Sequence, residues 1–302
     1  MNSVLYALAT LGLNREVLVQ APYYNNYKGQ VENTMSFVNG TMNGLKFNLD
    51  ADPELHTTFE INTYPNNPDG RKRAPLVSDP SRVIYDCVYN WPQYTAIDED
   101  PLEGDIMIFS ASKNTGHAGT RLGWALVKDP EIADKMREFV ARSLGVSIDT
   151  QLRIYSVLKS INSDFVAEKS GFYDWGSSTM NDRFDQVDSL FGESGVMREI
   201  EFVNRKERGA YVWLKCLKGI DCQRVLREEV FVEGNSGIQY GVGGEYVRIQ
   251  FMARSVEIEQ FLISLKNFFE GGDKLGRGYE MRDGDGGEGR TMGMGMGRGG
   301  GC

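Results

Sequence analysis

Short apolar segments alternate with helical patterns over the first half of the chain. Four of these segments are predicted strands, at residues 17–20, 57–62, 83–86 and 106–109. They are short, apolar and bounded by polar or turn-forming residues, as buried strands are. The chain opens on a helical pattern at residues 1–9. Strands that alternate with helices favour a largely parallel sheet covered by helices, so we expect an α/β fold with a large domain over residues 1–145.

The second half of the chain begins with two long helical patterns, at residues 150–161 and 174–190. Short strand patterns follow at residues 199–203, 210–214, 230–233 and 246–251, and an amphipathic helix is predicted at 256–269. We therefore expect a smaller α+β domain over residues 146–269. Residues 270–302 are rich in Gly, Arg, Asp and Met and have almost nothing to bury, which predicts a disordered tail.

Composition narrows the class of protein. A chain of 302 residues with 41% hydrophobic and 25% charged residues can bury a large core. Its net charge of -9 argues against a nucleic-acid surface, which needs clustered Lys and Arg. No apolar run is long enough to span a membrane and no secretory signal opens the chain, so we expect a cytoplasmic protein. Four cysteines without zinc-type spacing and two histidines predict no metal site.

The stretch 110–124 carries the most distinctive chemistry. Lys113 follows a predicted strand, where ligands gather in open α/β sheets, and a lysine there can hold an aldehyde cofactor such as pyridoxal phosphate as a Schiff base. Ser110 offers a hydroxyl and Arg121 a two-pronged guanidinium to the cofactor phosphate. For a lone lysine, a solvated loop position is the commoner role. The neighbouring residues favour the chemical role.

Two more segments place polar side chains after predicted strands. Asp86 ends the strand pattern 83–86, and its carboxylate there can pair with a pyridine nitrogen and keep that nitrogen protonated. Tyr89 and Asn67, the latter in the tight turn 64–70, can each hydrogen-bond the hydroxyl of the cofactor ring. Taken alone, Asp86 is more simply a cap or turn residue, and most such turns carry no chemistry.

These motifs, in this order, resemble the plant alliinase and tryptophan aminotransferase-related family of fold type I pyridoxal phosphate-dependent enzymes. The resemblance is carried by residues 85–95 and 112–129 and extends over about residues 1–269. It implies pyridoxal 5'-phosphate as the cofactor and Lys113 as the Schiff-base lysine. It also implies the cofactor roles given above for Asn67, Asp86, Tyr89, Ser110 and Arg121.

The resemblance adds two residues. It implies that Arg248, in the strand pattern 245–251, binds the substrate carboxylate, and that Tyr24 stacks on the cofactor ring. A physical argument also supports an anionic partner for Arg248, because a charge within an alternating strand is costly unless it is paired. A salt bridge to a neighbouring acid is the alternative for Arg248, and simple packing is the alternative for Tyr24.

The expected activity is transfer of an amino group from an aromatic amino acid, with tryptophan as the first candidate, to a 2-oxo acid. An alliinase-like carbon-sulfur lyase acting on cysteine sulfoxides needs the same residues and is the alternative. The two reactions differ in the pocket for the substrate side chain, which the segment 211–214 can line, although core packing is commoner for such a strand. The resemblance further implies a homodimer whose interface completes both active sites.

The opening of the chain raises a third alternative. The resemblance places a glycine- and hydroxyl-rich turn before the first helix, whereas residues 1–9 here read as a helix already under way. Because a helix amino end and its preceding loop bind anions, we expect weaker binding of the cofactor phosphate. A truncated family member with weak or no activity is therefore the third reading of this sequence.

Overall fold

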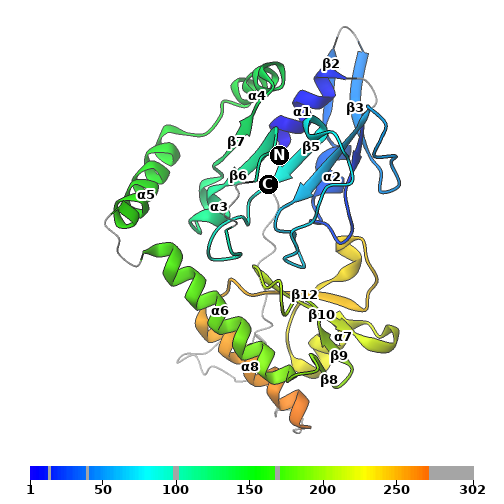
Figure 1. Cartoon of the computed structure of the whole chain (residues 1–302), viewed down its shortest axis with the longest axis vertical. Helices are drawn as coiled ribbons and strands as arrows, with labels where there is room; N and C mark the ends of the chain where they lie inside the picture. The colour runs from blue at the N-terminus through cyan, green and yellow to red at the C-terminus, as the bar shows by residue number, and fades with distance from the viewer. Residues whose placement is uncertain (13–14, 39–40, 98–101, 167–170, 272–302) are drawn as a thin grey trace, which may run out of the picture.

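Two sheets form the framework of the chain, one above the other in Figure 1. The computed structural model describes residues 1–12, 15–38, 41–97, 102–166 and 171–271. The upper sheet has seven strands in the order β2-β3-β1-β4-β5-β6-β7, and the lower sheet has five in the order β11-β12-β10-β9-β8. The two sheets lie on either side of the predicted boundary at residue 145, and the exact boundary stays a prediction. The predicted tail lies outside the described residues from residue 272 onward.

The upper sheet is mostly parallel, which confirms the predicted α/β class. Its strands are β1 (Arg15–Leu18), β2 (Met35–Val38), β3 (Thr41–Phe47), β4 (Thr58–Thr63), β5 (Val83–Asp86), β6 (Ile106–Ser110) and β7 (Gly123–Val127). The five central strands β3, β1, β4, β5 and β6 run parallel to one another, whereas the outer strands β2 and β7 pair antiparallel with β3 and β6. Every residue of β4 is buried, as expected for a parallel strand covered on both faces. The predicted strand 83–86 matches β5 exactly.

Helices cover this sheet. They are α1 (Asn2–Leu11), α2 (Tyr27–Glu32), the short α3 (Ala111–Asn114) and α4 (Pro130–Arg142), with 3₁₀ turns η1 (Pro80–Arg82) and η2 (Ala118–Thr120). α1 buries Val4, Leu5 and Leu8 in a core shared with β1, β4, β5 and β6, and it packs beside α4. α4 begins at Pro130 because the carboxylate of Asp129 accepts hydrogen bonds from the first free backbone amides.

The lower part carries the second sheet. Its strands are β8 (Val196–Met197), β9 (Ile200–Phe202), β10 (Tyr211–Cys216), β11 (Asn235–Ser236) and β12 (Tyr246–Gln250). Its helices are α5 (Ile148–Val166), α6 (Phe172–Phe191), α7 (Cys222–Val225) and α8 (Ser255–Glu270), with helical turns η3 (Leu217–Gly219), η4 (Leu226–Val230) and η5 (Gly237–Tyr240). Figure 1 shows α6 and α8 side by side below the molecule's centre.

Alternation along β10 and β12 separates the two faces of the lower sheet. Val212 and Leu214 on β10, with Val247 and Ile249 on β12, are buried in the core shared with α6 and α8. Because side chains alternate along a strand, Arg248 and its cross-strand partner Trp213 lie on the opposite face. That face contributes to the site described below.

One predicted strand is wrong. Residues 230–233 form no strand, because the chain turns through η4 and Phe231 takes a left-handed conformation with φ 59°. Val230 and Val232 are both buried while Phe231 between them is exposed, and this alternation imitates the period of a strand. The strand neighbouring β12 here is β11 instead.

The structure also contains a bond that the cysteine spacing did not predict. Cys216 and Cys222 form a disulfide that closes a loop of the lower sheet, while Cys87 is a buried free thiol. Disulfides persist mainly in oxidising compartments, and the compartment of this chain stays a prediction. No helix in the described ranges has the length and apolar character needed to cross a membrane.

Candidate functional site

The predicted cofactor residues gather at one edge of the upper sheet. β1, β4, β5 and β6 are parallel, so their carboxyl ends meet at the same edge. β7 is antiparallel to β6, with Ser110 opposite Gly123, so the start of β7 lies at that edge too. The segments that meet there carry Tyr24 after β1, Asn67 after β4, Asp86 and Tyr89 at the end of β5, Ser110 and Lys113 at the end of β6, and Arg121 before β7.

Asp86 is a buried acid at the centre of this edge. Its Oδ2 accepts a hydrogen bond from Tyr27 Oη at 2.7 Å, and its Oδ1 accepts one from the backbone amide of Val88 at 3.3 Å. Burial raises the pKa of Asp86, and the bond from Tyr27 opposes that rise. Among the described residues, no Lys, Arg or His forms an ion pair with Asp86. The charge of the amino-terminal ammonium of Met1 also lowers the pKa of Asp86, without an ion pair to Asp86 among the described residues, so a ligand cation in direct contact can still pair with the carboxylate.

A chain of polar contacts joins this edge to the lower sheet. Asn67 Nδ2 lies 3.4 Å from Tyr89 Oη, and Arg248 Nη1 donates to Asn67 Oδ1 at 3.1 Å. Tyr89 Oη also lies 2.5 Å from Tyr211 Oη, within a small cluster of buried side chains. The structure thus brings Asn67, Tyr89 and Arg248 together, although 181 residues separate the first from the last.

Arg248 carries a positive charge without an acidic partner in the described part of the chain. Its guanidinium carbon lies 4.1 Å from the ring centre of Tyr211 and 5.0 Å from that of Tyr240. Its Nε is buried and has no hydrogen-bond partner. The alternative of a salt bridge to a neighbouring acid therefore does not describe this arginine. Aromatic rings and one amide hold a guanidinium that still has donors for a carboxylate.

Lys113 lies on the short helix α3, directly after β6. Ser110 caps this helix, because its Oγ accepts a hydrogen bond from Ser112 N at 3.1 Å, and that bond leaves the hydroxyl hydrogen for another acceptor. The backbone carbonyl of Lys113 accepts hydrogen bonds from Tyr94 Oη at 3.1 Å and Gln93 Nε2 at 3.3 Å. Lys113 Nζ lies 5.5 Å from the ring centre of Tyr89. The amine of Lys113 thus lies near the ring of Tyr89, whose hydroxyl contacts Asn67 and Tyr211.

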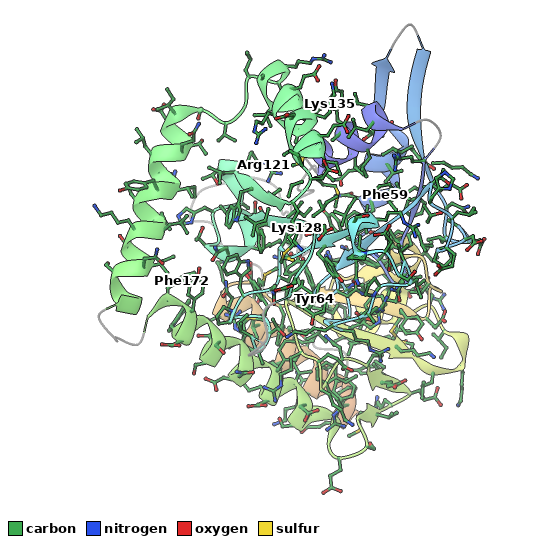
Figure 2. The ribbon with its side chains drawn as sticks, turned by 45° about the horizontal axis from the view of Figure 1, so that its top comes forward. Phe59, Tyr64, Arg121, Lys128, Lys135 and Phe172 are labelled. Atoms are coloured by element: carbon green, nitrogen blue, oxygen red, sulfur yellow. A yellow bond between two sulfur atoms is a disulfide. The ribbon has the colours of Figure 1, made fainter. Side chains whose placement is uncertain are left out.

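Tyr24 and Arg121 are the remaining predicted cofactor residues. The ring of Tyr24 meets that of Tyr27 edge to face, with centroids 5.3 Å apart. Tyr27 in turn contacts Asp86, so Tyr27 lies between Tyr24 and Asp86 in this chain of contacts. Arg121 lies beside β7 in Figure 2, is exposed, and adopts a left-handed conformation with φ 52°. Its Nη1 donates to the carbonyl of Ala118 at 3.0 Å. The role of each in cofactor binding stays a prediction.

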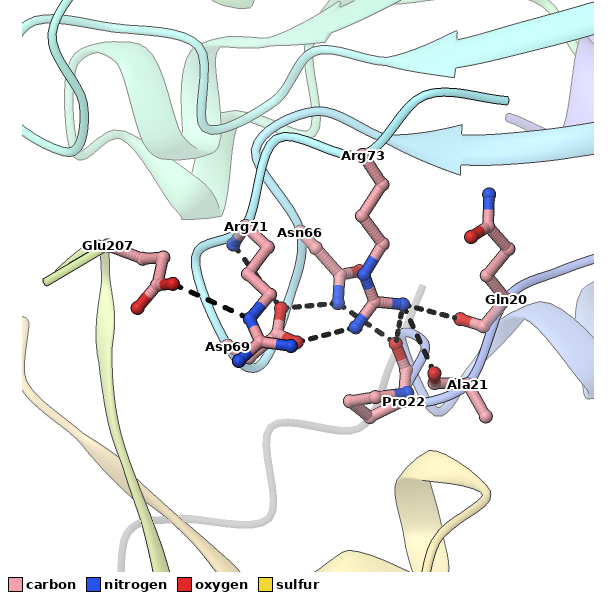
Figure 3. A network of polar contacts seen from close by, with 8 residues as sticks. All are labelled: Gln20, Ala21, Pro22, Asn66, Asp69, Arg71, Arg73 and Glu207. Carbon is pink, nitrogen blue, oxygen red and sulfur yellow. Dashed lines mark hydrogen bonds and ion pairs between the residues drawn. The ribbon is translucent and has the colours of Figure 1, made fainter. Parts of the chain in front are cut away.

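A polar network fixes the turn that carries Asn67, and sequence reasoning missed it. Figure 3 shows Asp69 between Asn66 and Arg73: Asn66 Nδ2 donates to Asp69 Oδ1 at 2.7 Å, and Arg73 Nη2 donates to Asp69 Oδ2 at 2.5 Å. Asn66 and Arg73 also donate to the carbonyl of Pro22, at 2.9 Å and 3.3 Å. The network ties the turn after β4 to the segment after β1, which positions Asn67 relative to Tyr24.

Tyr27 is a second residue that the sequence did not single out. Its Oη bonds both Asp86 and Thr63, and burial raises the pKa of Tyr27 well above its ordinary value, so it remains a neutral donor. Nothing local marks it, because its partner is 59 residues away along the chain. Tyr211 was expected only as a possible lining residue of the side-chain pocket, and its contacts with Tyr89 and Arg248 were not predicted.

The fold is that of the fold type I pyridoxal phosphate-dependent aminotransferases. An aminotransferase from Staphylococcus aureus superposes with a TM-score of 0.66 at 19% identity, over 89% of this chain and 74% of that one. Aspartate aminotransferase from Thermus thermophilus with maleate superposes with a TM-score of 0.67 at 16% identity, over 88% and 73%. At these identities the likeness shows the fold alone.

The sequence comparisons define the family. Residues 1–269 match the family model described as Allinase, and the chain belongs to this family, as its motifs predicted. Tryptophan aminotransferase-related protein 2 of Arabidopsis thaliana is 38% identical over 225 residues, which are 70% of this chain and 51% of that protein. An alliin lyase of Allium cepa var. aggregatum is 29% identical over 276 residues, 84% and 60% respectively. The chain thus spans little more than half the length of these curated relatives.

Proposed function

We propose that this chain binds pyridoxal 5'-phosphate and transfers the amino group of an aromatic amino acid, tryptophan first, to a 2-oxo acid. One observation carries the proposal: Asp86 and Arg248 are close enough for both of their charges to act on the phenol of Tyr24, and neither forms an ion pair within the described residues. A ligand with a cationic ring nitrogen and a bound carboxylate satisfies both charges. The names of the relatives support tryptophan as the amino donor.

The donors and acceptors of the site fit this cofactor. The carboxylate of Asp86 suits a protonated pyridine nitrogen, and the side chains of Asn67 and Tyr89 suit a ring oxygen. The free hydroxyl hydrogen of Ser110 and the guanidinium of Arg121 suit a phosphate. When it is bound, the cofactor supplies an electron sink for a carbanion.

The protein side chains provide binding and proton transfer. Arg248 would bind the substrate carboxylate and so orient the α carbon, while the amine of Lys113 would remove the α proton and return it at the cofactor carbon that carried the aldehyde. The rings of Tyr211 and Tyr240 have their centres 4.1 Å and 5.0 Å from the guanidinium carbon of Arg248. Burial raises the pKa of Tyr24, and the charge of Arg248 opposes that rise. Such an aromatic wall suits an aromatic substrate side chain.

The direct test supplies the purified, cofactor-loaded protein with tryptophan and pyruvate, and separately with a cysteine sulfoxide. Formation of the indole oxo acid from tryptophan supports the proposal. Release of pyruvate from the sulfoxide without transamination replaces it with the carbon-sulfur lyase reaction, which the alliin lyase relatives suggest. If neither product forms while the cofactor is bound, the proposed function is wrong.

Changing Arg248 to lysine tests the carboxylate contact. Lysine keeps the charge but loses the planar fork, so we expect the KM for the amino donor to rise by about 10-fold to 100-fold with a smaller change in kcat. Steady-state kinetics measure both parameters. Arg254→Lys is the matched control, because Arg254 is exposed and pairs with Glu257 at the start of α8. A KM shift equal to that of the control contradicts the assigned role.

The surface of α5 supports a homodimer, which we also propose. Leu144 is 92% exposed just before this helix, and Ile148, Leu152 and Tyr155 on it are 73%, 59% and 62% exposed. Contiguous apolar side chains of this size mark interaction surfaces. Light scattering is expected to give twice the chain's mass, and Leu152→Glu with Tyr155→Glu is expected to give the monomer mass. A monomeric wild type contradicts the proposal.

A further inference from the structure

Tyr211 touches both of the groups that the proposed reaction needs at the junction of the two sheets. Its hydroxyl meets Tyr89 and its ring meets Arg248. We infer that Tyr211 is a positioning residue with two separable functions: its ring holds the guanidinium of Arg248 for the substrate carboxylate, and its hydroxyl sets the proton of Tyr89 toward the cofactor. This inference rests on the proposed function.

The strand register places the ring of Tyr211 against Arg248. On β10 and β12, Trp213 is opposite Arg248 and Tyr211 is opposite Gln250, so Tyr211 and Arg248 are diagonal neighbours on one face. The guanidinium carbon lies 4.1 Å from the ring centre, close enough for the negative face of the ring to attract the cation. With no acid paired to Arg248 in the described chain and its Nε unbonded, the ring is a main stabilising contact of this charge.

The hydroxyl of Tyr211 contacts Tyr89, which follows β5 of the upper sheet. Tyr89 and Tyr211 are both buried, and their hydroxyl oxygens are 2.5 Å apart. Asn67 Nδ2 already donates to Tyr89 Oη. If Tyr211 donates as well, Tyr89 accepts two hydrogen bonds and its own hydrogen is left for the cofactor. A donor that itself accepts hydrogen bonds is a stronger donor, because neighbouring bonds polarise one another.

Two substitutions separate the two functions. Tyr211→Phe keeps the ring and loses the hydroxyl, while Tyr211→Leu loses both. Tyr246→Phe is the matched control: it removes a hydroxyl from the neighbouring strand β12, where the ring stacks on Trp213 and lies beside its cross-strand partner Lys215. Each protein is loaded with pyridoxal phosphate and checked for folding by circular dichroism.

Two measurements other than activity test the contacts of Tyr211 with Arg248 and with Tyr89. Calorimetry with 3-phenylpropanoate, a carboxylate probe, measures the contact with Arg248. We expect Tyr211→Leu to weaken probe binding by about 5-fold to 30-fold and Tyr211→Phe to leave it within about 2-fold. A pH titration of the bound cofactor's visible absorption measures the contact of Tyr89. We expect its midpoint to rise by about half a pH unit in Tyr211→Phe, because a weaker donor favours the protonated cofactor.

The outcomes distinguish this inference from the proposed function. If the wild type shows the cofactor's visible band and both Tyr211 variants match Tyr246→Phe in both measurements, the role of Tyr211 is wrong and the proposed function stands. If the wild type shows no band with pyridoxal phosphate, both are wrong. Should Tyr211→Leu fail to fold, the midpoint of Tyr211→Phe decides alone, because that variant keeps the shape of the buried side chain.

Discussion

Changing Lys113 to alanine is expected to lower the rate of the proposed transamination by at least ~10³-fold, the largest effect of any single substitution. The amine lies beside the ring of Tyr89, and the backbone carbonyl of Lys113 accepts hydrogen bonds from Tyr94 and Gln93, which hold α3 in place. The variant is also expected to lose the proposed covalent link to the cofactor and to keep the proposed noncovalent contacts from Asp86, Asn67 and Ser110.

The link can be measured directly. Treating the loaded wild type with borohydride and mapping its peptides by mass is expected to place the reduced cofactor on Lys113. Lys128→Ala is the matched control, since Lys128 pairs with Asp105 on the surface at the far end of β7. Modification of another lysine, or unchanged turnover in Lys113→Ala, contradicts the assigned role.

Changing Asp86 to asparagine is expected to lower activity by at least ~10²-fold, while making the protein without cofactor more stable. Asparagine is close in shape, and its carbonyl can still accept the hydrogen bond from Tyr27, but it cannot keep a ring nitrogen protonated. Because burial raises the pKa of Asp86, the ionised carboxylate costs the folded protein free energy near neutral pH. The substitution removes that cost.

The raised pKa of Asp86 determines how the stability of the wild type changes with pH. A carboxyl group whose pKa is raised by folding binds its proton more tightly in the folded state. The wild type therefore gains stability as the pH falls from the raised pKa toward the ordinary carboxyl value of about 4. We expect Asp86→Asn without cofactor to melt higher than the wild type at about pH 8, with the difference narrowing as the pH falls.

Thermal unfolding of the cofactor-free proteins across this pH range measures the difference. Asp182→Asn, which changes an exposed acid on α6, is the control and is expected to show no such trend. A melting difference that is constant with pH contradicts the assignment of the cost to the charge of Asp86. Retained turnover contradicts its role toward the cofactor.

The elements with a clear local signal were predictable from the sequence. β5 is a short run of buried apolar residues ended by an acid, and α8 has a regular amphipathic pattern, so both were found within a residue or two of their bounds. Residues 230–233 failed because two buried valines around an exposed phenylalanine satisfy the strand period without any partner strand. The periodicity of a segment indicates which of its residues are buried, but it does not indicate whether another strand is present to form hydrogen bonds with it.

The same limit applies to the site. Asn67, Asp86, Tyr89 and Lys113 each follow a predicted strand, and the rule that parallel strands end at one edge brings them together. Tyr27 and Tyr211 could not be recognised this way, since each acts on a residue far along the chain. Tyr211 also lies in a strand whose alternation gives no sign that one face meets a second sheet. Only the folded arrangement shows that a tyrosine of β10 reaches the residues after β5.

The separation of Arg248 from the other site residues has a consequence for how such proteins diversify. The groups suited to the cofactor come from the seven-stranded sheet, whereas the guanidinium and its aromatic neighbours come from the five-stranded sheet. Under the proposed function, substitutions on η5 and β12, and on β10 away from Tyr211, can therefore alter which amino acid is accepted while the residues suited to the coenzyme stay unchanged. A single scaffold can in this way give rise to paralogues with different chemistries.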